Sequence, residues 1–418
     1  MLAVITVSPG TFLAIVSTAA VAGTLAALAT GRGVVVPVVV IELLLGVVIG
    51  PHVLGLHANS FIEFFSDLGL GLLFFFAGYE IDPHQIAGQP LKLGLLGWGL
   101  SLVLAYAIGG VLEAAGIVLS LLYTGSALTT TAIGTLIPIL SDTGELDTRF
   151  GTYLVAAGAV GEFGPIMLLT LVLSTQSPLH NALILIGFVA LAVGVALLAV
   201  RSSKRTLPLF ERTLESSSQL AVRWIVVLVF ALALLAFKLG LELLLGGFAA
   251  GIITRQVLRT RELPAFDSKL TAVAFGVFVP FFFVYSGMNL DVTALFASVG
   301  GVVKMGVFFV LFLVVRGTPA MLLYRHVFNR RERVALAFMS STQLPLVLAI
   351  TTLAVDTGHM RASTAAALVG AAVLSTLVYP ILGLRLRGDL IPDLAIDSPE
   401  IYSAGGESPA IDSAASAD

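Results

Sequence analysis

Two charged side chains interrupt long apolar segments of the chain, where a charge is costly. Glu162 stands in Val160-Gly161-Glu162-Phe163-Gly164-Pro165, near the middle of an apolar segment over 150–175, and Arg316 stands within another over 301–324. A lipid-facing carboxylate at that depth costs about 3 kcal/mol or more, so both side chains should face a cavity or a partner. We expect Glu162 to bind a proton or a cation, with Arg316 as its counter-charge or structural partner. A salt bridge that only locks two helices together is the plainer alternative.

Two further apolar segments are rich in hydroxyl groups and contain proline. They cover 117–140, with Pro138, and 334–355, with Pro345. Proline removes a backbone donor, and the freed carbonyls and nearby hydroxyls can then serve a cation, although Ser and Thr also bridge packed helices. We expect a broken helix in each segment, and the candidate ligands are Thr129, Thr130, Thr131, Ser340, Ser341, Thr342 and Gln343.

The composition of the chain explains why these polar groups stand out. Of the 418 residues, 58% are hydrophobic and 11% are charged, and the mean hydropathy is +1.04. Apolar runs of about 20 residues, each able to cross a bilayer as a helix, recur from end to end. The sequence therefore predicts an all-α polytopic membrane protein. Its thirteen predicted spans lie near 8–30, 34–50, 61–80, 91–114, 117–140, 150–175, 180–200, 218–237, 240–254, 270–289, 301–324, 334–355 and 362–384.

The distribution of positive charge sets the expected orientation. Most of the 22 Lys and Arg residues follow odd-numbered spans, which places those segments in the cytoplasm, the N-terminus outside and the C-terminus inside. The first apolar run has no basic leader and no cleavage pattern, so it is interpreted as a retained span. Residues 386–418 are acidic and rich in Ser, Ala and Gly, which predicts a disordered cytoplasmic tail. The transmembrane domain is expected over 1–385.

Weak internal matches indicate two homologous halves, roughly 34–200 and 240–385. Glu42-Leu-Leu-Leu-Gly46 recurs as Glu242-Leu-Leu-Leu-Gly246, and Phe74-Phe-Phe-Ala-Gly78 before Asp82 resembles Phe281-Phe-Phe with Gly287 and Asp291. Glu42 and Glu242 begin spans that run in opposite directions, so the repeats would be inverted, as in many secondary transporters.

Other chemistries find little support in the sequence. The chain has no cysteine, and its six histidines fall in loops or at span ends, so no metal cluster is indicated. No nucleophile motif or phosphate loop points to an enzyme, and no cofactor or nucleic acid is expected.

At this point the sequence resembles the monovalent cation:proton antiporters, in the branch of the Kef-type potassium/proton and NapA-type sodium/proton exchangers. The resemblance covers about residues 10–385. It is carried by Glu42 through Pro51 with Val53-Leu-Gly55, by Leu68 through Asp82, and by Phe281-Phe-Phe through Asp291. It implies a homodimer in a prokaryotic cytoplasmic membrane, a scaffold domain beside a mobile core domain, two crossing broken helices, and elevator-like alternating access. Spans 5 and 12 would be the crossing pair.

The sequence departs from that family at its centre. The family usually has Asp-Asp or Asn-Asp where this chain has Gly161-Glu162, and commonly Lys where it has Arg316. Arg stays protonated, so Glu162 is the titratable candidate. One exchanging carboxylate predicts electroneutral exchange of sodium or potassium for protons. The alternatives are transport of an organic anion on the same fold, with Arg316 binding its carboxylate, and a membrane sensor or assembly subunit without transport.

Overall fold

The structure is a computed structural model that describes residues 9–30, 37–81, 86–172, 178–214, 216, 218–241, 243–258, 264–290, 293 and 299–388. Within these residues all regular secondary structure is helical. The elements of the first half are α1 (Pro9–Thr30), α2 (Val38–Ile49), α3 (Ser60–Tyr79), α5 (Gln89–Ala114), α6 (Leu121–Leu128), α7 (Ile133–Asp142), α8 (Arg149–Val172) and α9 (Pro178–Leu214). Those of the second half are α10 (Leu220–Lys238), α11 (Leu243–Leu258), α12 (Pro264–Val273), the π-helix η1 (Ala274–Phe278), α13 (Val279–Met288), α15 (Val299–Leu323), the 3₁₀ turn η2 (Tyr324–His326), α16 (Arg330–Ser340), α17 (Pro345–Asp356) and α18 (Ala362–Arg387).

Each of the thirteen predicted spans has a helical counterpart. In the described part of the chain, nine helices are long and apolar enough to cross a membrane, and α16 with α17, bent by 40°, forms a tenth candidate. The remaining predicted spans correspond to three shorter apolar segments at Val38–Ile49, Leu121–Ile137 and Leu243–Leu258. The prediction of an all-helical membrane protein is confirmed.

Two helices extend beyond the predicted spans. The seventh span was expected to end near 200, but α9 continues to Leu214. Hydropathy marks the apolar thickness of a membrane, and it does not show where a helix ends once it has left that layer. The tail was expected from 386, but α18 runs to Arg387. The tail from 389 onward, and the repeat residues Asp82, Glu242 and Asp291, lie outside the described residues.

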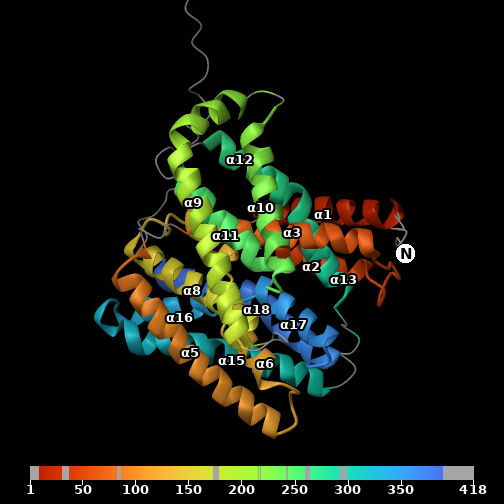
Figure 1. Ribbon diagram of the computed structural model, residues 1–418. Helices are drawn as coiled ribbons and strands as arrows, with labels where there is room; N and C mark the ends of the chain where they lie inside the picture. The colour runs from red at the N-terminus through yellow and green to blue at the C-terminus, as the bar shows by residue number, and fades with distance from the viewer. Residues whose placement is uncertain are drawn as a thin grey trace, which may run out of the picture.

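The helices pack in two groups (Figure 1). In the first, α3 packs against α11 and α13, α2 packs against α13 and α1, and α10 packs against α11. In the second, α5 packs against α8, α15 against α18, and α16 against both α15 and α18. Residues 34–200 and 240–385 contribute to both groups, so the sequence halves are not the packing units.

The second group has the symmetry expected of a repeat. α5 packs against α6 and α8 in the first half, as α15 packs against α16 and α18 in the second. The broken pair α6 and α7 corresponds in order to α16 and α17, and the halves exchange contacts, since α6 packs on α17 and α8 on α16. This arrangement brings the two breaks together.

Glycines allow the helices of the first group to touch through their backbones. A Cβ atom at Gly78 of α3 would overlap the Phe248 carbonyl of α11, and one at Gly251 of α11 would overlap the Phe75 carbonyl of α3. Between α2 and α13, a Cβ at Gly46 would overlap the Val284 carbonyl. Small residues at such contacts are the usual means of close helix approach in membranes. The glycines of the repeated sequence motifs therefore have a packing role.

A buried ion cluster fixes the end of α18 to the second group. Arg387 Nε and Nη2 donate to Glu145 Oε1 and Oε2 at 2.8 and 2.9 Å, and Arg387 Nη1 donates to Glu332 Oε1 at 3.1 Å. Its guanidinium lies 4.5 Å from the centre of the Phe150 ring. Glu145 follows α7 and Glu332 opens α16, so one arginine joins three elements.

Candidate functional site: the crossing of two broken helices

Both predicted broken spans are interrupted at their hydroxyl-rich residues. The first break separates Leu128 of α6 from Ile133 of α7, and the second separates Ser340 of α16 from Pro345 of α17. Pro345 is the first residue of its helix, where its missing N–H costs nothing. Pro138, in contrast, lies within α7 and does not mark the break. In the first break, hydroxyl groups donate to backbone carbonyls in the last turn of α6. Thr129 Oγ1, for example, donates to the Ser126 carbonyl at 2.9 Å.

The two breaks cross in direct contact, as the resemblance implied for spans 5 and 12. Their contacts combine backbone and side-chain groups, so neither break is exposed to lipid without partners. Four hydrogen bonds join them: Ala132 N–H to the Thr342 carbonyl at 2.8 Å, Thr130 Oγ1 to Gln343 Oε1 at 2.7 Å, Thr131 Oγ1 to the Ser340 carbonyl at 2.6 Å, and Gln343 Nε2 to the Leu128 carbonyl at 3.4 Å.

Two hydroxyl groups of α18 form hydrogen bonds with the backbone of the second break. Ser375 Oγ accepts the Gln343 backbone N–H at 3.0 Å, and Thr376 Oγ1 donates to the Gln343 carbonyl at 3.0 Å. Ser375 and Thr376 are buried. Sequence reasoning missed them because single Ser and Thr residues in a long apolar span carry no signal of their own.

The candidate ligands are all buried, and most of them already hold the crossing together. Thr130, Thr131 and Gln343 bridge the breaks, while Ser341 Oγ donates to the Ala337 carbonyl at 2.6 Å within its own helix. Thr342 Oγ1 differs, because it is buried and has no hydrogen-bond partner. The hydroxyl-rich pattern therefore marks the architecture of the site first, and Thr342 retains an unused oxygen.

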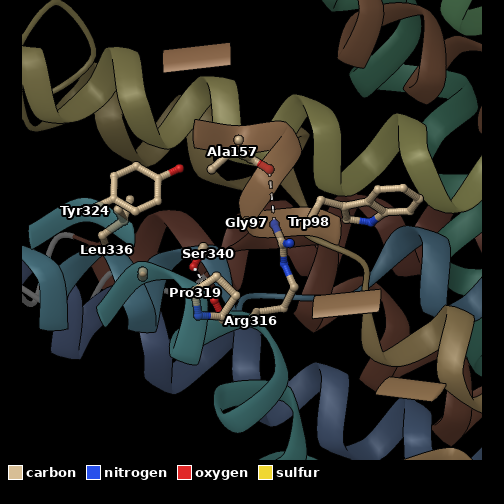
Figure 2. A pocket seen from close by; sticks show the side chains of 10 residues that line it. Gly97, Trp98, Ala157, Arg316, Pro319, Tyr324, Leu336 and Ser340 are labelled. Carbon is tan, nitrogen blue, oxygen red and sulfur yellow. Dashed lines mark hydrogen bonds between the residues drawn. The ribbon is translucent and has the colours of Figure 1, made fainter. Parts of the chain in front are cut away.

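Arg316 is the clamp of this crossing. Its side chain is buried, and its three nitrogens each donate a hydrogen bond: Nε to Thr131 Oγ1 at 2.9 Å, Nη1 to Ser101 Oγ at 3.4 Å, and Nη2 to the Ala157 carbonyl at 3.1 Å. Figure 2 shows the guanidinium group reaching from α15 to Ala157 of α8, beside Trp98. The cavity around it has a volume of only about 10 Å³, roughly the room for one water molecule. The guanidinium group is directed to these three oxygens, which fits a structural partner better than a counter-charge of Glu162.

Gly161 makes room for that guanidinium. A Cβ atom at residue 161 would overlap Arg316 Nη2, and it would lie 2.8 Å from Thr131 Oγ1 and 3.0 Å from Arg316 Cζ. A carboxylate side chain at residue 161 and the arginine in this position cannot coexist without rearrangement. The two departures from the family pattern, Gly161 and Arg316, are therefore one structural feature.

Glu162 lies beside the crossing with a carboxylate that is only partly satisfied. The residue is 3% exposed, and its Oε2 atom is buried without a hydrogen-bond partner. The backbone N–H groups of Ile133 and Gly134, at the start of α7, lie close to the carboxylate. The partial positive charge of a helix N-terminus favours an anion there. A buried, incompletely paired carboxylate needs a further partner, which a proton or a small cation can supply.

Two cavities approach the region between the helix groups at opposite ends of α3. One, of about 230 Å³, lies at the end that carries Tyr79 and Glu80 and is also lined by Val155 of α8 and Arg255 of α11. The other, of about 540 Å³, lies at the end that carries Glu63 and is also lined by residues of α13, α17 and α18.

Proteins with similar sequences carry the names of antiporters. The chain matches the family described as "Sodium/hydrogen exchanger, transmembrane" over residues 13–383. It is 25% identical over 368 residues to the putative Na⁺/H⁺ antiporter YjbQ of Bacillus subtilis. This alignment covers 83% of this chain and 58% of YjbQ. It is 27% identical over 264 residues to the Na⁺/H⁺-K⁺ antiporter GerN of Bacillus cereus. This alignment covers 61% of this chain and 65% of GerN. The chain thus spans somewhat less than two thirds of these relatives.

A solved structure has the same fold. The sodium proton antiporter MjNhaP1 from Methanocaldococcus jannaschii, determined at pH 8, superposes with a TM-score of 0.63 at 15% identity and covers 91% of this chain and 99% of its own. The family match confirms the resemblance recognised in the sequence motifs, and the structural match confirms the fold. The chain therefore belongs to the sodium/hydrogen exchanger family.

Proposed function

We propose that the protein exchanges a monovalent cation for a proton across the membrane, with Glu162 as the residue that binds each in turn. One observation carries the proposal: a buried carboxylate with an unpaired oxygen lies at the N-terminus of α7, beside two crossing broken helices. Half-helix termini at the bilayer midplane are the usual ion sites of secondary transporters. Thr342 Oγ1 is the additional oxygen ligand that we assign to the cation.

The exchange follows from competition for one carboxylate. A proton or a cation neutralises Glu162, and either leaves only when the other, or water, can replace it. Arg316 keeps its charge throughout and holds the two breaks in contact. Because one carboxylate alternates between one proton and one cation, the exchange is electroneutral. Since every guanidinium nitrogen already donates to the protein, transport of an organic anion on Arg316 gains no support.

Alternating access would come from movement of the second helix group against the first. The glycine contacts make the first group a scaffold, and α5–α8 with α15–α18 form the core that carries Glu162. The cavities at opposite ends of α3 are then the two aqueous approaches, and the one beside Glu80 faces the cytoplasm if the N-terminus is outside. Two copies of the chain would form the working dimer in a prokaryotic cytoplasmic membrane.

Sodium is the cation that we propose first. The description of the family names sodium as the exchanged cation, and the name of the relative GerN includes potassium as well. Both cations take oxygen ligands, so the geometry around Glu162 does not distinguish them. A direct comparison of sodium, potassium and lithium is therefore part of the test.

The test is cation-driven pH change in proteoliposomes of the wild type, of Glu162→Gln and of Glu113→Gln. Glu113 is an exposed residue near the end of α5 and serves as the control. We expect exchange in the wild type and the control and its loss in Glu162→Gln. Exchange that survives Glu162→Gln would exclude this residue as the site. A wild type that responds to no cation would favour a sensor or assembly subunit, and exchange driven by membrane potential alone would refute electroneutrality.

A further inference from the structure

The cavity at the Glu80 end of α3 lies against the core helices that position Glu162. Its volume is about 230 Å³, and six of its lining residues bear on the argument: Glu80, Ile137, Asp147, Thr152, Val155 and Arg255. They come from the end of α3, from α7, from the start of α8 and the loop before it, and from α11. The cavity is therefore bounded by both helix groups.

Two helices that line this cavity also carry or face Glu162. Val155, Ala159 and Glu162 are four and three residues apart, so they share one face of the helix. Glu162 is two turns beyond the cavity wall at Val155, which is about 10 Å along the axis. On α7, Ile137 in the cavity wall is one turn beyond the N–H groups that face Glu162. The side chain between the two on α8 is only the methyl group of Ala159.

Glu80 lines the cavity and interacts electrostatically with Glu162. It is the residue that ends α3, and its carboxylate lines the cavity while its Oε2 atom is buried without a hydrogen-bond partner. Its charge and that of Glu162 are close enough to interact. Two such carboxylates repel one another when both are ionised, and a cation near them relieves that repulsion.

The basic and acidic groups around Glu80 do not satisfy it. The Arg255 guanidinium lies 5.9 Å from the centre of the Tyr79 ring, and the Tyr79 hydroxyl donates to Asp267 Oδ1 at 2.5 Å. Arg255 is thus engaged with Tyr79, and its Nε atom is itself buried without a partner. Asp147 is exposed, at the outer part of the cavity.

We propose that Glu80 is the entry carboxylate of the exchange site, which draws a monovalent cation from this cavity and passes it to Glu162. This inference rests on the proposed function and adds the route by which the cation reaches the site from one side. A charged residue in a narrow, low-dielectric cavity raises the local concentration of its counter-ion. Glu80 would act on cation capture from its own side only, since the opposite cavity reaches the core through α13, α17 and α18.

The test measures cation dependence separately from each side of the membrane. Vesicles of defined orientation, carrying wild type, Glu80→Gln, Glu80→Asp or Asp147→Asn, are assayed for sodium-driven proton exchange over a range of sodium concentrations on one side at a time. For Glu80→Gln we expect the half-saturating concentration to rise at least about tenfold on the Glu80 side and to stay unchanged on the other. Glu80→Asp should shift it less, and Asp147→Asn, an exposed and screened charge, by less than about twofold.

Several outcomes would overturn the inference. They are an unchanged half-saturating concentration in Glu80→Gln, an equal rise on both sides, and an equal rise in Asp147→Asn. If Glu80→Gln does not fold, as judged by its elution as a single species in detergent, the side-specific shift in Glu80→Asp decides. Failure of the proposed function is separate, because the wild type would then show no cation-driven exchange in the same vesicles.

Discussion

Because Arg316 packs against Gly161, we predict that Gly161→Ala lowers the stability of the protein, whereas the same change usually stabilises a helix. Replacing a mid-helix glycine by alanine normally stabilises the helix by about 1 kcal/mol. In Gly161→Ala the new methyl group would overlap Arg316 Nη2 and lie 2.8 Å from Thr131 Oγ1. Overpacking costs about 1–3 kcal/mol, and losing the bond from Nη2 to the Ala157 carbonyl costs about 1.5–3 kcal/mol. After the helix gain is subtracted, the expected net loss is about 1.5–5 kcal/mol.

The assay is the free energy of unfolding measured by titration from mild to denaturing detergent. The matched control is Gly306→Ala in α15, where a Cβ atom would meet nothing within 4 Å. It should be neutral or stabilising by up to about 1 kcal/mol. In an Arg316→Lys background, which removes the crowding nitrogen, the loss from Gly161→Ala should shrink by about 1 kcal/mol or more. Equal stability of Gly161→Ala and wild type, or the same loss in both backgrounds, would refute the assignment of Gly161 as space for the arginine.

Two further predictions concern stability. Arg387→Ala removes the cation shared by Glu145 and Glu332 and should lower the free energy of unfolding by about 3–5 kcal/mol, because it leaves Glu145 buried and unpaired; the exposed Arg385→Ala is the control, and similar losses in both variants would contradict the reasoning. Thr130→Val removes the donor to Gln343 Oε1 at the crossing and should cost about 1–3 kcal/mol in the same titration. A cost below about 0.5 kcal/mol would show that this bond does not hold the breaks together.

The fold could be predicted in outline because hydropathy and charge follow the membrane directly. Runs of apolar residues locate helices, and the hydroxyl-rich stretches at Thr129–Thr131 and Ser340–Thr342 located both breaks. Helix ends beyond the membrane could not be predicted in this way, as the extension of α9 to Leu214 shows. The sequence also did not predict which helices form each packing group. Each group combines segments from both sequence halves, through contacts that depend on glycine backbones.

The residues of the candidate site were chosen from the sequence by their charge. Glu162 and Arg316 stood out because an intramembrane charge needs an explanation, and both lie beside the crossing. Of the two relations expected for Arg316, counter-charge or structural partner, the hydrogen bonds favour the second, since the guanidinium group donates to three neutral oxygens. Glu80 was not among the candidate residues, because its position at the end of α3 does not reveal that its Oε2 atom is buried.

The backbone contacts of α3 with α11 and of α2 with α13 also limit how the protein can change its volume. Helices that touch without an intervening layer of side chains have nothing to repack, so a shift between them would open a gap that no rotamer could fill. Space is therefore gained or lost between the two groups, where the cavities of about 230 and 540 Å³ lie. In the proposed transport cycle, the first group would keep its internal packing while the cavities on its two sides change in size.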